Sequence, residues 1–121
     1  MPNAPIEAVP IERVPIEQRR ILKTVIPGPR SELLHKRKLS AVSAGIGTGL
    51  PVYVERAGGG IVVDVDGNQL IDFGSGIAVT SVGNSAPRVV AAVQSQVVDF
   101  THTCFMVTPY EEYVDVCEHL N

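Results

Sequence analysis

The sequence contains no apolar run that approaches the roughly 20 residues of a membrane-spanning helix. Its first residues, MPNAPIEAVPIERV, also lack the apolar centre of a secretory signal. Cysteine occurs only at Cys104 and Cys117, too rarely for a disulfide-stabilised exported domain. We therefore expect a cytoplasmic protein whose two cysteines are reduced thiols, with no membrane partner.

Positive charge is scarce over most of the chain, which carries a net charge of −3. Residues 1–40 hold eight Lys and Arg against four Asp and Glu, whereas residues 41–121 hold two against nine. A short basic arm is not the basic face that nucleic-acid binding requires. We expect no nucleic-acid partner, and a length of 121 residues allows one hydrophobic core.

Proline recurs at every fifth position from Pro5 to Arg19, in the sequence PIEAV, PIERV, PIEQR. Proline has no N–H to donate and disfavours helix at the residue before it. Residues 1–30 are therefore expected to form a Pro-rich arm that is extended or disordered. Three copies of five residues are too few for a solenoid.

Residues 31–73 are expected to form an N-terminal helix and an antiparallel meander. Ser31 is a candidate N-cap for the helix. The strand-like runs VYVERA, IVVDV and QLIDF follow, separated by GGG and by Asp66-Gly67. An Asp-Gly pair between strand-forming runs is a strong hairpin signal. The predicted fold class is α/β.

Residues 74–121 are expected to form an uncharged stretch and two helices. The first helix begins at Pro87 and carries apolar residues at three- and four-residue spacing up to Phe100. The second has Thr108 as a candidate N-cap and Glu111 as its capping-box partner. Each helix has an apolar face that needs a partner surface.

Two patterns resemble metal sites without meeting their requirements. Residues 64–68 have the carboxylate spacing of a calcium loop, but Gln69 and Ser75 stand where glycine and glutamate are required. Cys117 and His119 are two apart on a predicted helix, about 200° from each other, so they cannot bind one zinc ion together. We predict no metal site and identify no catalytic acid, base or cofactor lysine.

The stretch DFGSGIAVTSVGN, from Asp72 to Asn84, combines uncharged residues with several glycines. Glycines beside Ile77 allow the backbone to approach a ligand closely, and the apolar residues can line a pocket wall. A buried crossover that uses glycine for its turns explains the same residues. Both interpretations remain open on these residues alone.

Two long motifs carry a family resemblance: DVDGNQLIDFGSGIAV, and the segment PRVVAAVQSQVVDFTHTCFMVTPYEEYVDVCEHLN that follows. They resemble the N-terminal region of class III pyridoxal-phosphate-dependent aminotransferases, which have the fold-type-I transferase architecture. Ile77 and the sequence HTCF of residues 102–105 are similar to the branch that acts on 4-aminobutyrate. The resemblance covers at least residues 51–121.

The resemblance implies substrate-binding roles for Ile77 and Met106 and pocket-lining roles for Ser75 and Gly76. The family's cofactor lysine and its other catalytic groups correspond to positions beyond Asn121, so no catalytic or cofactor-binding residue is expected here. Members often read Gly-His-x-His-Pro where this chain has Gly83-Asn84-Ser85-Ala86-Pro87, and this departure should alter only the entrance to the next helix. Glutamine commonly stands where this chain has Met106.

The implied function is the transfer of an amino group from 4-aminobutyrate to 2-oxoglutarate by a larger protein that uses pyridoxal phosphate. Its ligands would be amino acids and 2-oxo acids, and it would form a homodimer or a higher homo-oligomer. This chain would then be an N-terminal fragment, inactive alone, with exposed apolar helix faces. Two alternatives are another ω-amino-acid aminotransferase, such as an acetylornithine-type enzyme, and a stand-alone protein-interaction module.

Overall fold

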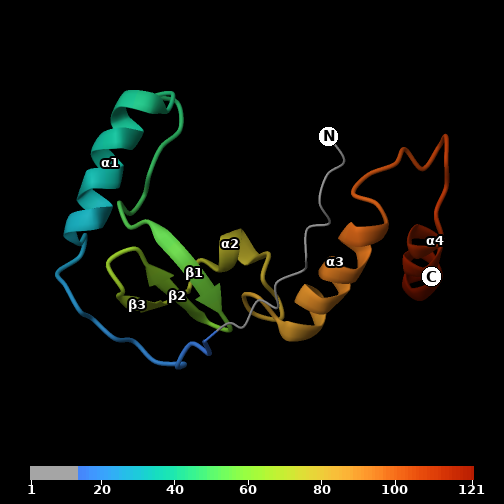
Figure 1. Ribbon diagram of the computed structural model, residues 1–121, viewed down its shortest axis with the longest axis horizontal. Helices are drawn as coiled ribbons and strands as arrows, with labels where there is room; N and C mark the ends of the chain where they lie inside the picture. Colours follow the sequence, from blue (N-terminus) through green and yellow to red (C-terminus); the bar gives the residue numbers. More distant parts are fainter. Residues whose placement is uncertain (1–13) are drawn as a thin grey trace, which may run out of the picture. The chain divides into compact units, whose positions relative to one another are not determined.

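The computed structural model describes residues 14–121 (Figure 1). Contacts divide the chain into two units, one that ends at Ser85 and one that runs from Ala86 to Asn121. The first two copies of the Pro-Ile-Glu repeat lie outside the described residues for most of their length. The stretch 74–85 belongs to the first unit, and the functional division at residue 73 stays a prediction.

A three-stranded antiparallel sheet is the centre of the first unit. Its strands are β1 (Val54–Gly58), β2 (Ile61–Asp64) and β3 (Gln69–Ile71), in the order β1-β2-β3. Ile61 and Val63 of β2 are the buried apolar residues of the described chain, 3% and 4% exposed. They share one face because alternate residues of a strand point the same way. The predicted meander is confirmed.

Buried polar side chains complete this small core. The loop between β2 and β3 is organised by Asp64 and Asn68, neither of which is exposed. Asp64 Oδ1 accepts the N–H groups of Asp66 at 2.9 Å and Asn68 at 2.8 Å, and its Oδ2 accepts the Asn68 amide at 2.8 Å. Gly67 completes the turn at φ 82°, a left-handed angle that favours glycine. The residues that resemble a calcium loop thus bind one another.

The same asparagine holds the segment that precedes the first helix. Asn68 Oδ1 accepts the N–H groups of Lys23 at 2.8 Å and Thr24 at 2.9 Å. Ile21 pairs with Gln69 through two backbone hydrogen bonds of 3.0 and 2.7 Å. This segment is therefore extended and lies beside β3.

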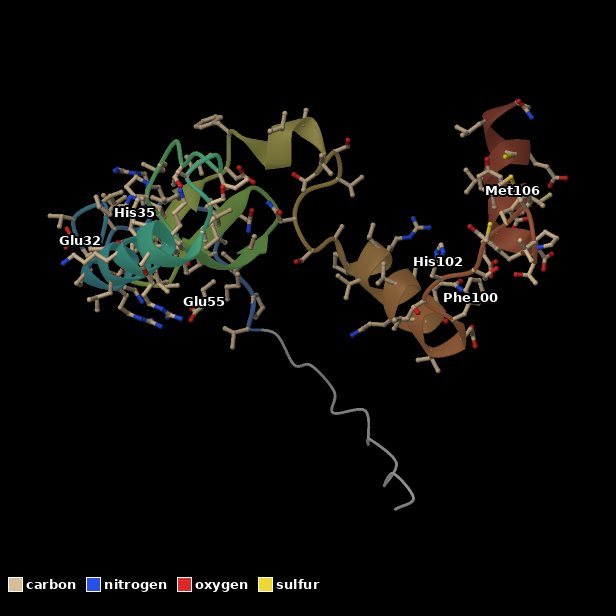
Figure 2. All side chains as sticks on the ribbon, turned by 90° about the horizontal axis from the view of Figure 1, so that it is seen from above. Glu32, His35, Glu55, Phe100, His102 and Met106 are labelled. Atoms are coloured by element: carbon tan, nitrogen blue, oxygen red, sulfur yellow. The ribbon has the colours of Figure 1, made fainter. Side chains whose placement is uncertain are left out.

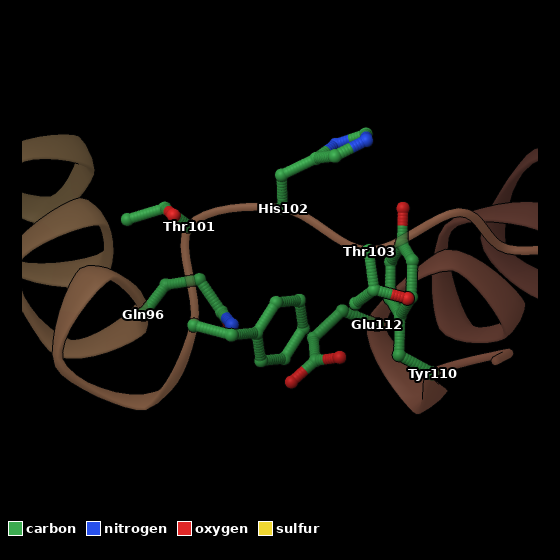
Figure 3. A pocket seen from close by; sticks show the side chains of 7 residues that line it. Gln96, Thr101, His102, Thr103, Tyr110 and Glu112 are labelled. Carbon is green, nitrogen blue, oxygen red and sulfur yellow. The ribbon is translucent and has the colours of Figure 1, made fainter.

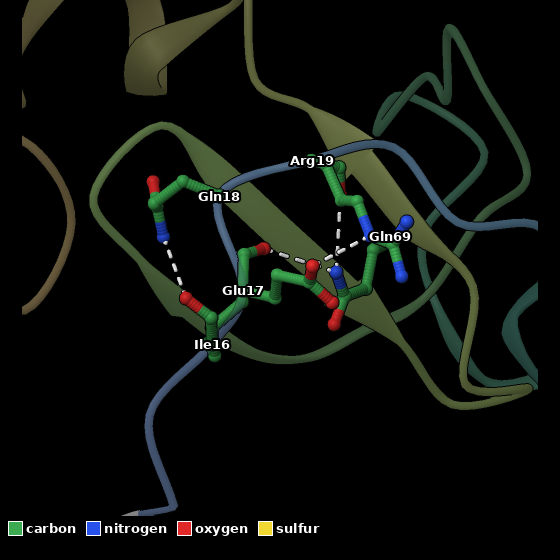
Figure 4. A network of polar contacts seen from close by, with 5 residues as sticks. All are labelled: Ile16, Glu17, Gln18, Arg19 and Gln69. Atoms are coloured by element: carbon green, nitrogen blue, oxygen red, sulfur yellow. Dashed lines mark hydrogen bonds and ion pairs between the residues drawn. The ribbon is translucent and has the colours of Figure 1, made fainter.

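The third copy of the Pro-Ile-Glu repeat also contacts the sheet. The Gln69 amide donates to the backbone carbonyls of Glu17 at 3.1 Å and Arg19 at 3.0 Å (Figure 4). Gln18 donates to Gly58 O at 3.1 Å and accepts the N–H of Gly60 at 3.1 Å. These bonds order residues 17–19 against β3 and the β1–β2 turn.

Helix α1 (Pro29–Ala41) is capped by a side chain from the β2–β3 loop. The Asp66 carboxylate accepts the N–H of Arg30 at 2.8 Å and that of Ser31 at 2.9 Å. The prediction that Ser31 is the N-cap is wrong, because Gly28 occupies the cap position and Ser31 lies buried inside the first turn. A Cβ on Gly28 would lie 2.4 Å from Asp66 Cγ, so glycine leaves room for this distant cap.

We expect the first turn of α1 to loosen in acid. Burial tends to raise the pKa of Asp66, but the N–H groups of Arg30 and Ser31, the Ser31 hydroxyl and the Arg30 charge lower it below the usual 3.8. A folded-state pKa below the unfolded value stabilises the fold above pH 3.8, and this contribution is lost as the pH falls through the folded value.

The amide NMR shifts of Arg30 and Ser31 measure this transition. In Asp66→Ala, these amides should already have at neutral pH the shifts that the parent protein shows in acid. Asp99→Ala, an exposed substitution on another helix, should leave the acid transition in place. An unchanged transition in Asp66→Ala would contradict the capping role.

The second unit consists of α3 (Pro87–Asp99) and α4 (Glu111–Leu120). The helix predicted from Pro87 is confirmed. Thr108 is not the cap of the next helix as predicted, because Tyr110 occupies that position and Thr108 instead bonds to Thr103. Neither helix has a fully buried residue. The most exposed apolar residues of the two helices are Val89, Val93, Val97, Val98, Val116 and Leu120.

An aromatic cluster organises the connection between α3 and α4. The ring centroids of Phe105 and Tyr113 are 4.6 Å apart, and Tyr110 lies 5.4 Å from Phe105 and 5.5 Å from Phe100. Edge-to-face pairs at these distances are favourable. Within residues 14–121, none of the helices is both long and apolar enough to cross a membrane.

Candidate functional site

The short element α2 (Ser75–Ala78) is a left-handed turn. The φ angles of its four residues are 47° at Ser75, 62° at Gly76, 63° at Ile77 and 62° at Ala78. Left-handed backbone costs about 1–2 kcal/mol per non-glycine residue, and a β-branched residue such as isoleucine is a clear outlier there. Strain of this kind persists only where the surroundings impose it, and it is concentrated at functional sites.

One carboxylate holds the start of this turn. Asp72 Oδ1 accepts the N–H groups of Ser75 at 2.8 Å and Gly74 at 3.1 Å, and its Oδ2 accepts the Asn84 amide at 3.0 Å. The Ser75 N–H, then the Asn84 amide, and also the Gly74 N–H lower the pKa of Asp72, against an opposing effect of desolvation. The carboxylate is therefore the stable form at neutral pH.

The far end of the stretch is fixed to the first hairpin. Asn84 exchanges two backbone hydrogen bonds with Gly59, of 2.9 and 2.8 Å, and the Asp72 N–H donates to Gly60 O at 2.9 Å. Gly83 has a φ of 83°, and a Cβ there would lie 3.1 Å from the Gly59 Cα. The backbones pass so closely that glycine is required at residue 83.

The predicted site residues lie in both units. Ile77 is 94% exposed, Gly76 is exposed and Ser75 is half-buried, with its hydroxyl 2.5 Å from that of Thr80. Met106 belongs to the α3–α4 connection and is 92% exposed (Figure 2). The first three share one turn, and the substrate-binding and pocket-lining roles stay predictions.

Asp72 and Asn84 are the residues that the sequence analysis missed. Aspartate and asparagine beside glycine-rich turns commonly accept or donate local backbone hydrogen bonds, and this pattern is visible in the sequence. The expectation that the asparagine alters only the entrance to the next helix is wrong. Its side chain bonds to Asp72, twelve residues earlier, which holds the left-handed turn.

A second candidate surface is a shallow hollow of about 230 Å³ between the end of α3 and the start of α4 (Figure 3). Gln96, His102 and Glu112 contribute polar side chains, and Phe100 and Tyr110 contribute aromatic rings. Gln96 Nε2 is buried and has no hydrogen-bond partner among the described residues. The other lining residues are Thr101 and Thr103.

The described residues form no cradle for a metal ion. Within residues 14–121, no three His, Cys, Asp or Glu side chains are grouped as metal ligands would be. Cys104 and Cys117 are free thiols. His119 Nδ1 lies 2.7 Å from the backbone carbonyl oxygen of Asp115, one helical turn earlier.

The residues present do not fit pyridoxal phosphate either. The cofactor requires a lysine for its Schiff base and a carboxylate for its pyridine nitrogen. Lys23 and Lys36 are exposed, and Lys38 donates from Nζ to the Ile46 carbonyl at 2.5 Å. None of these lysines lies in the hollow of the second unit. The expectation that this chain contains no cofactor-binding residue stays a prediction.

Comparison with known proteins assigns the family. The family described as aminotransferase class-III matches residues 43–121, well over half of the chain. The chain belongs to the class-III aminotransferase family. The match includes the meander, the left-handed turn and both helices of the second unit, so the resemblance drawn from the motifs is confirmed.

Individual relatives agree with this class-III assignment. The chain is 68% identical over 104 residues to a 4-aminobutyrate aminotransferase of Mycobacterium tuberculosis, covering 86% of this chain and 23% of that protein. It is 47% identical over 91 residues to a 5-aminovalerate aminotransferase of Pseudomonas putida, covering 75% and 21%. The chain thus spans about a fifth of the length of the curated relatives it matches.

A solved transaminase structure confirms the fold. An omega-transaminase from Sphaerobacter thermophilus aligns with a TM-score of 0.55 at 25% identity, over 65% of this chain and 20% of that one. The predicted fold class, the N-terminal part of a pyridoxal-phosphate-dependent transferase, is confirmed by this neighbour together with the family match.

Proposed function

We propose that this chain is the N-terminal segment of a 4-aminobutyrate aminotransferase that passes the amino group to 2-oxoglutarate. The observation that carries the proposal is the 68% identity over 104 residues to a relative of that name. A relative named after 5-aminovalerate, which is one methylene longer, is 47% identical, and another relative named after 4-aminobutyrate is 42% identical. The choice of the shorter donor therefore rests on the 68% identity.

In this proposal the left-handed turn forms one wall of the substrate entrance. Ile77 presents an exposed apolar side chain, while Ser75 and Gly76 bring the backbone close to the ligand. The substrate-binding role of Met106, in the α3–α4 connection, is a separate part of the proposal. Pyridoxal phosphate would supply the electron sink for amino transfer and would be held by residues outside this segment.

The intact protein would be a cytoplasmic homodimer or higher homo-oligomer, with amino acids and 2-oxo acids as its ligands. The exposed apolar side chains of α3 and α4 support an assembly of this kind, because large exposed apolar patches commonly mark interfaces. The same faces also support a different function, in which the segment alone binds a partner protein.

The decisive experiment compares the intact protein with the 121-residue chain. We expect the intact protein loaded with pyridoxal phosphate to produce glutamate from 4-aminobutyrate and 2-oxoglutarate, and the chain alone to produce none, since it lacks an anchoring lysine. Amino-donor profiling with 5-aminovalerate and acetylornithine separates the related enzymes. Cofactor-dependent turnover by the chain alone would refute its expected inactivity, and absence of transamination by the intact protein would refute the proposed function.

A further inference from the structure

The left-handed turn has an exposed isoleucine at its centre and almost no packing to keep it there. Ile77 is 94% exposed, so contacts of its side chain do not determine where it points. The turn's own backbone bonds run from Ile77 N–H to Gly74 O and from Val79 N–H to Ser75 O, both at 2.8 Å. Longer ones run from Thr80 N–H to Ser75 O at 3.2 Å and from Ala78 N–H to Gly74 O at 3.4 Å, and the Ser75 and Thr80 hydroxyls are 2.5 Å apart. All of these bonds are local, and none joins the turn to the sheet. Something outside the turn must hold this strained backbone.

Asp72 and Asn84 provide that support through a continuous set of bonds. One carboxylate oxygen of Asp72 binds the N–H groups of Gly74 and Ser75, where the turn begins, and the other binds the Asn84 amide. Asn84 is in turn fixed to Gly59 by two backbone bonds. The first hairpin, the carboxylate and the turn are thereby coupled.

We propose that Asp72 and Asn84 are positioning residues that set the direction of Ile77 and, through it, the chain length of the accepted amino donor. This inference rests on the proposed function, in which Ile77 faces the substrate. Neither residue would touch the substrate itself. A shift of an apolar wall by one methylene is sufficient to change donor discrimination about tenfold.

The test uses the intact protein and four variants. Asp72→Ala removes all three hydrogen bonds of the carboxylate. Asn84→Ala removes only the bond between the Asn84 amide and Asp72 Oδ2. Asp72→Asn keeps an acceptor for the two N–H groups and pairs with Asn84 once that amide rotates, so it is the conservative rescue. Asp66→Ala is the matched control, because that carboxylate also binds two backbone N–H groups in the same unit but holds α1 instead.

The first measurement is the ratio of kcat/KM for 4-aminobutyrate to that for 5-aminovalerate. We expect Asp72→Ala to change this ratio about tenfold and Asn84→Ala to change it in the same direction by less. Asp72→Asn should stay close to the parent protein, and Asp66→Ala should leave the ratio unaltered. An unchanged ratio in Asp72→Ala, or an equal change in Asp66→Ala, would overturn the inference.

The second measurement is independent of activity. Hydrogen exchange at the Val79 amide, which bonds to Ser75 O inside the turn, should be faster in Asp72→Ala than in Asp66→Ala. If the intact protein transaminates neither donor, the proposed function fails. The exchange rates of the Val79 amide still test whether Asp72 stabilises the turn. Equal exchange rates in the two variants would refute the role of Asp72 in either case.

Discussion

Replacing Asp64 with alanine is expected to open the β2–β3 ladder far more often than any exposed substitution in this chain. Asp64 is fully buried, and its two oxygens accept the N–H groups of Asp66 and Asn68 and the Asn68 amide. Alanine leaves the two backbone N–H groups without this acceptor and the Asn68 amide with only Thr24 Oγ1, and Asn68 also orders Lys23 and Thr24. The expected loss is about 3 kcal/mol, which corresponds to roughly hundredfold faster opening.

Native-state hydrogen exchange of the Val62 and Leu70 amides, which are paired between β2 and β3, measures this opening in the intact protein. Asp99→Ala is the matched control, since Asp99 is exposed at the end of α3 and should change stability by about 0.5 kcal/mol or less. Asn68→Ala should approach the effect of Asp64→Ala because the two side chains share one set of bonds. A change no larger than that of the control would show that the loop is held by its backbone alone.

Local patterns predicted the elements of the fold, and distant side chains determined how the elements begin. The Asp66-Gly67 pair predicted the β2–β3 hairpin because this tight turn requires a left-handed φ, which glycine adopts without strain. The cap of α1 could not be found in this way, since the acceptor for Ser31 N–H is Asp66, 35 residues further along. In the sequence, Ser31 was the nearest side chain with an oxygen that could cap the helix. In the fold, the cap is the Asp66 carboxylate.

The calcium-like spacing of Asp64 and Asp66 shows the same limit. Carboxylates two residues apart next to glycine serve metal loops and tight turns equally well. Here one carboxylate is buried and bonded to the loop, whereas the other caps a helix. Position in three dimensions, which spacing does not encode, separates the two roles.

The glycines of the sequence predicted where the candidate site lies, but they did not predict its backbone conformation. Gly76 and Gly83 do adopt the left-handed angles that their presence suggests. Ser75 and Ile77 adopt them too, although their types argue against it. Propensity predicts what a residue prefers, and Asp72 imposes a conformation that its neighbours do not prefer.

Replacing Ile77 with glycine should therefore stabilise the turn and impair the enzyme at the same time. Glycine at φ 63° avoids the left-handed penalty of isoleucine, and little burial is lost because the side chain is 94% exposed. After the entropy that glycine loses on folding, the net gain is about 1 kcal/mol, seen as slower exchange of the Val79 amide. The proposed apolar wall disappears, so kcat/KM for 4-aminobutyrate should fall by about tenfold or more.

Val82→Gly is the matched control for this pair of opposite effects. Val82 is also exposed, at 71%, but lies beyond the turn and outside the left-handed residues. Glycine there should destabilise the protein by about 0.5–1 kcal/mol and leave donor discrimination intact. If Ile77→Gly were instead both less stable and fully active, the strain would be absent and the wall would lie elsewhere. The two signs together distinguish a residue kept for function from one kept for folding, because only the former lowers stability in its native form.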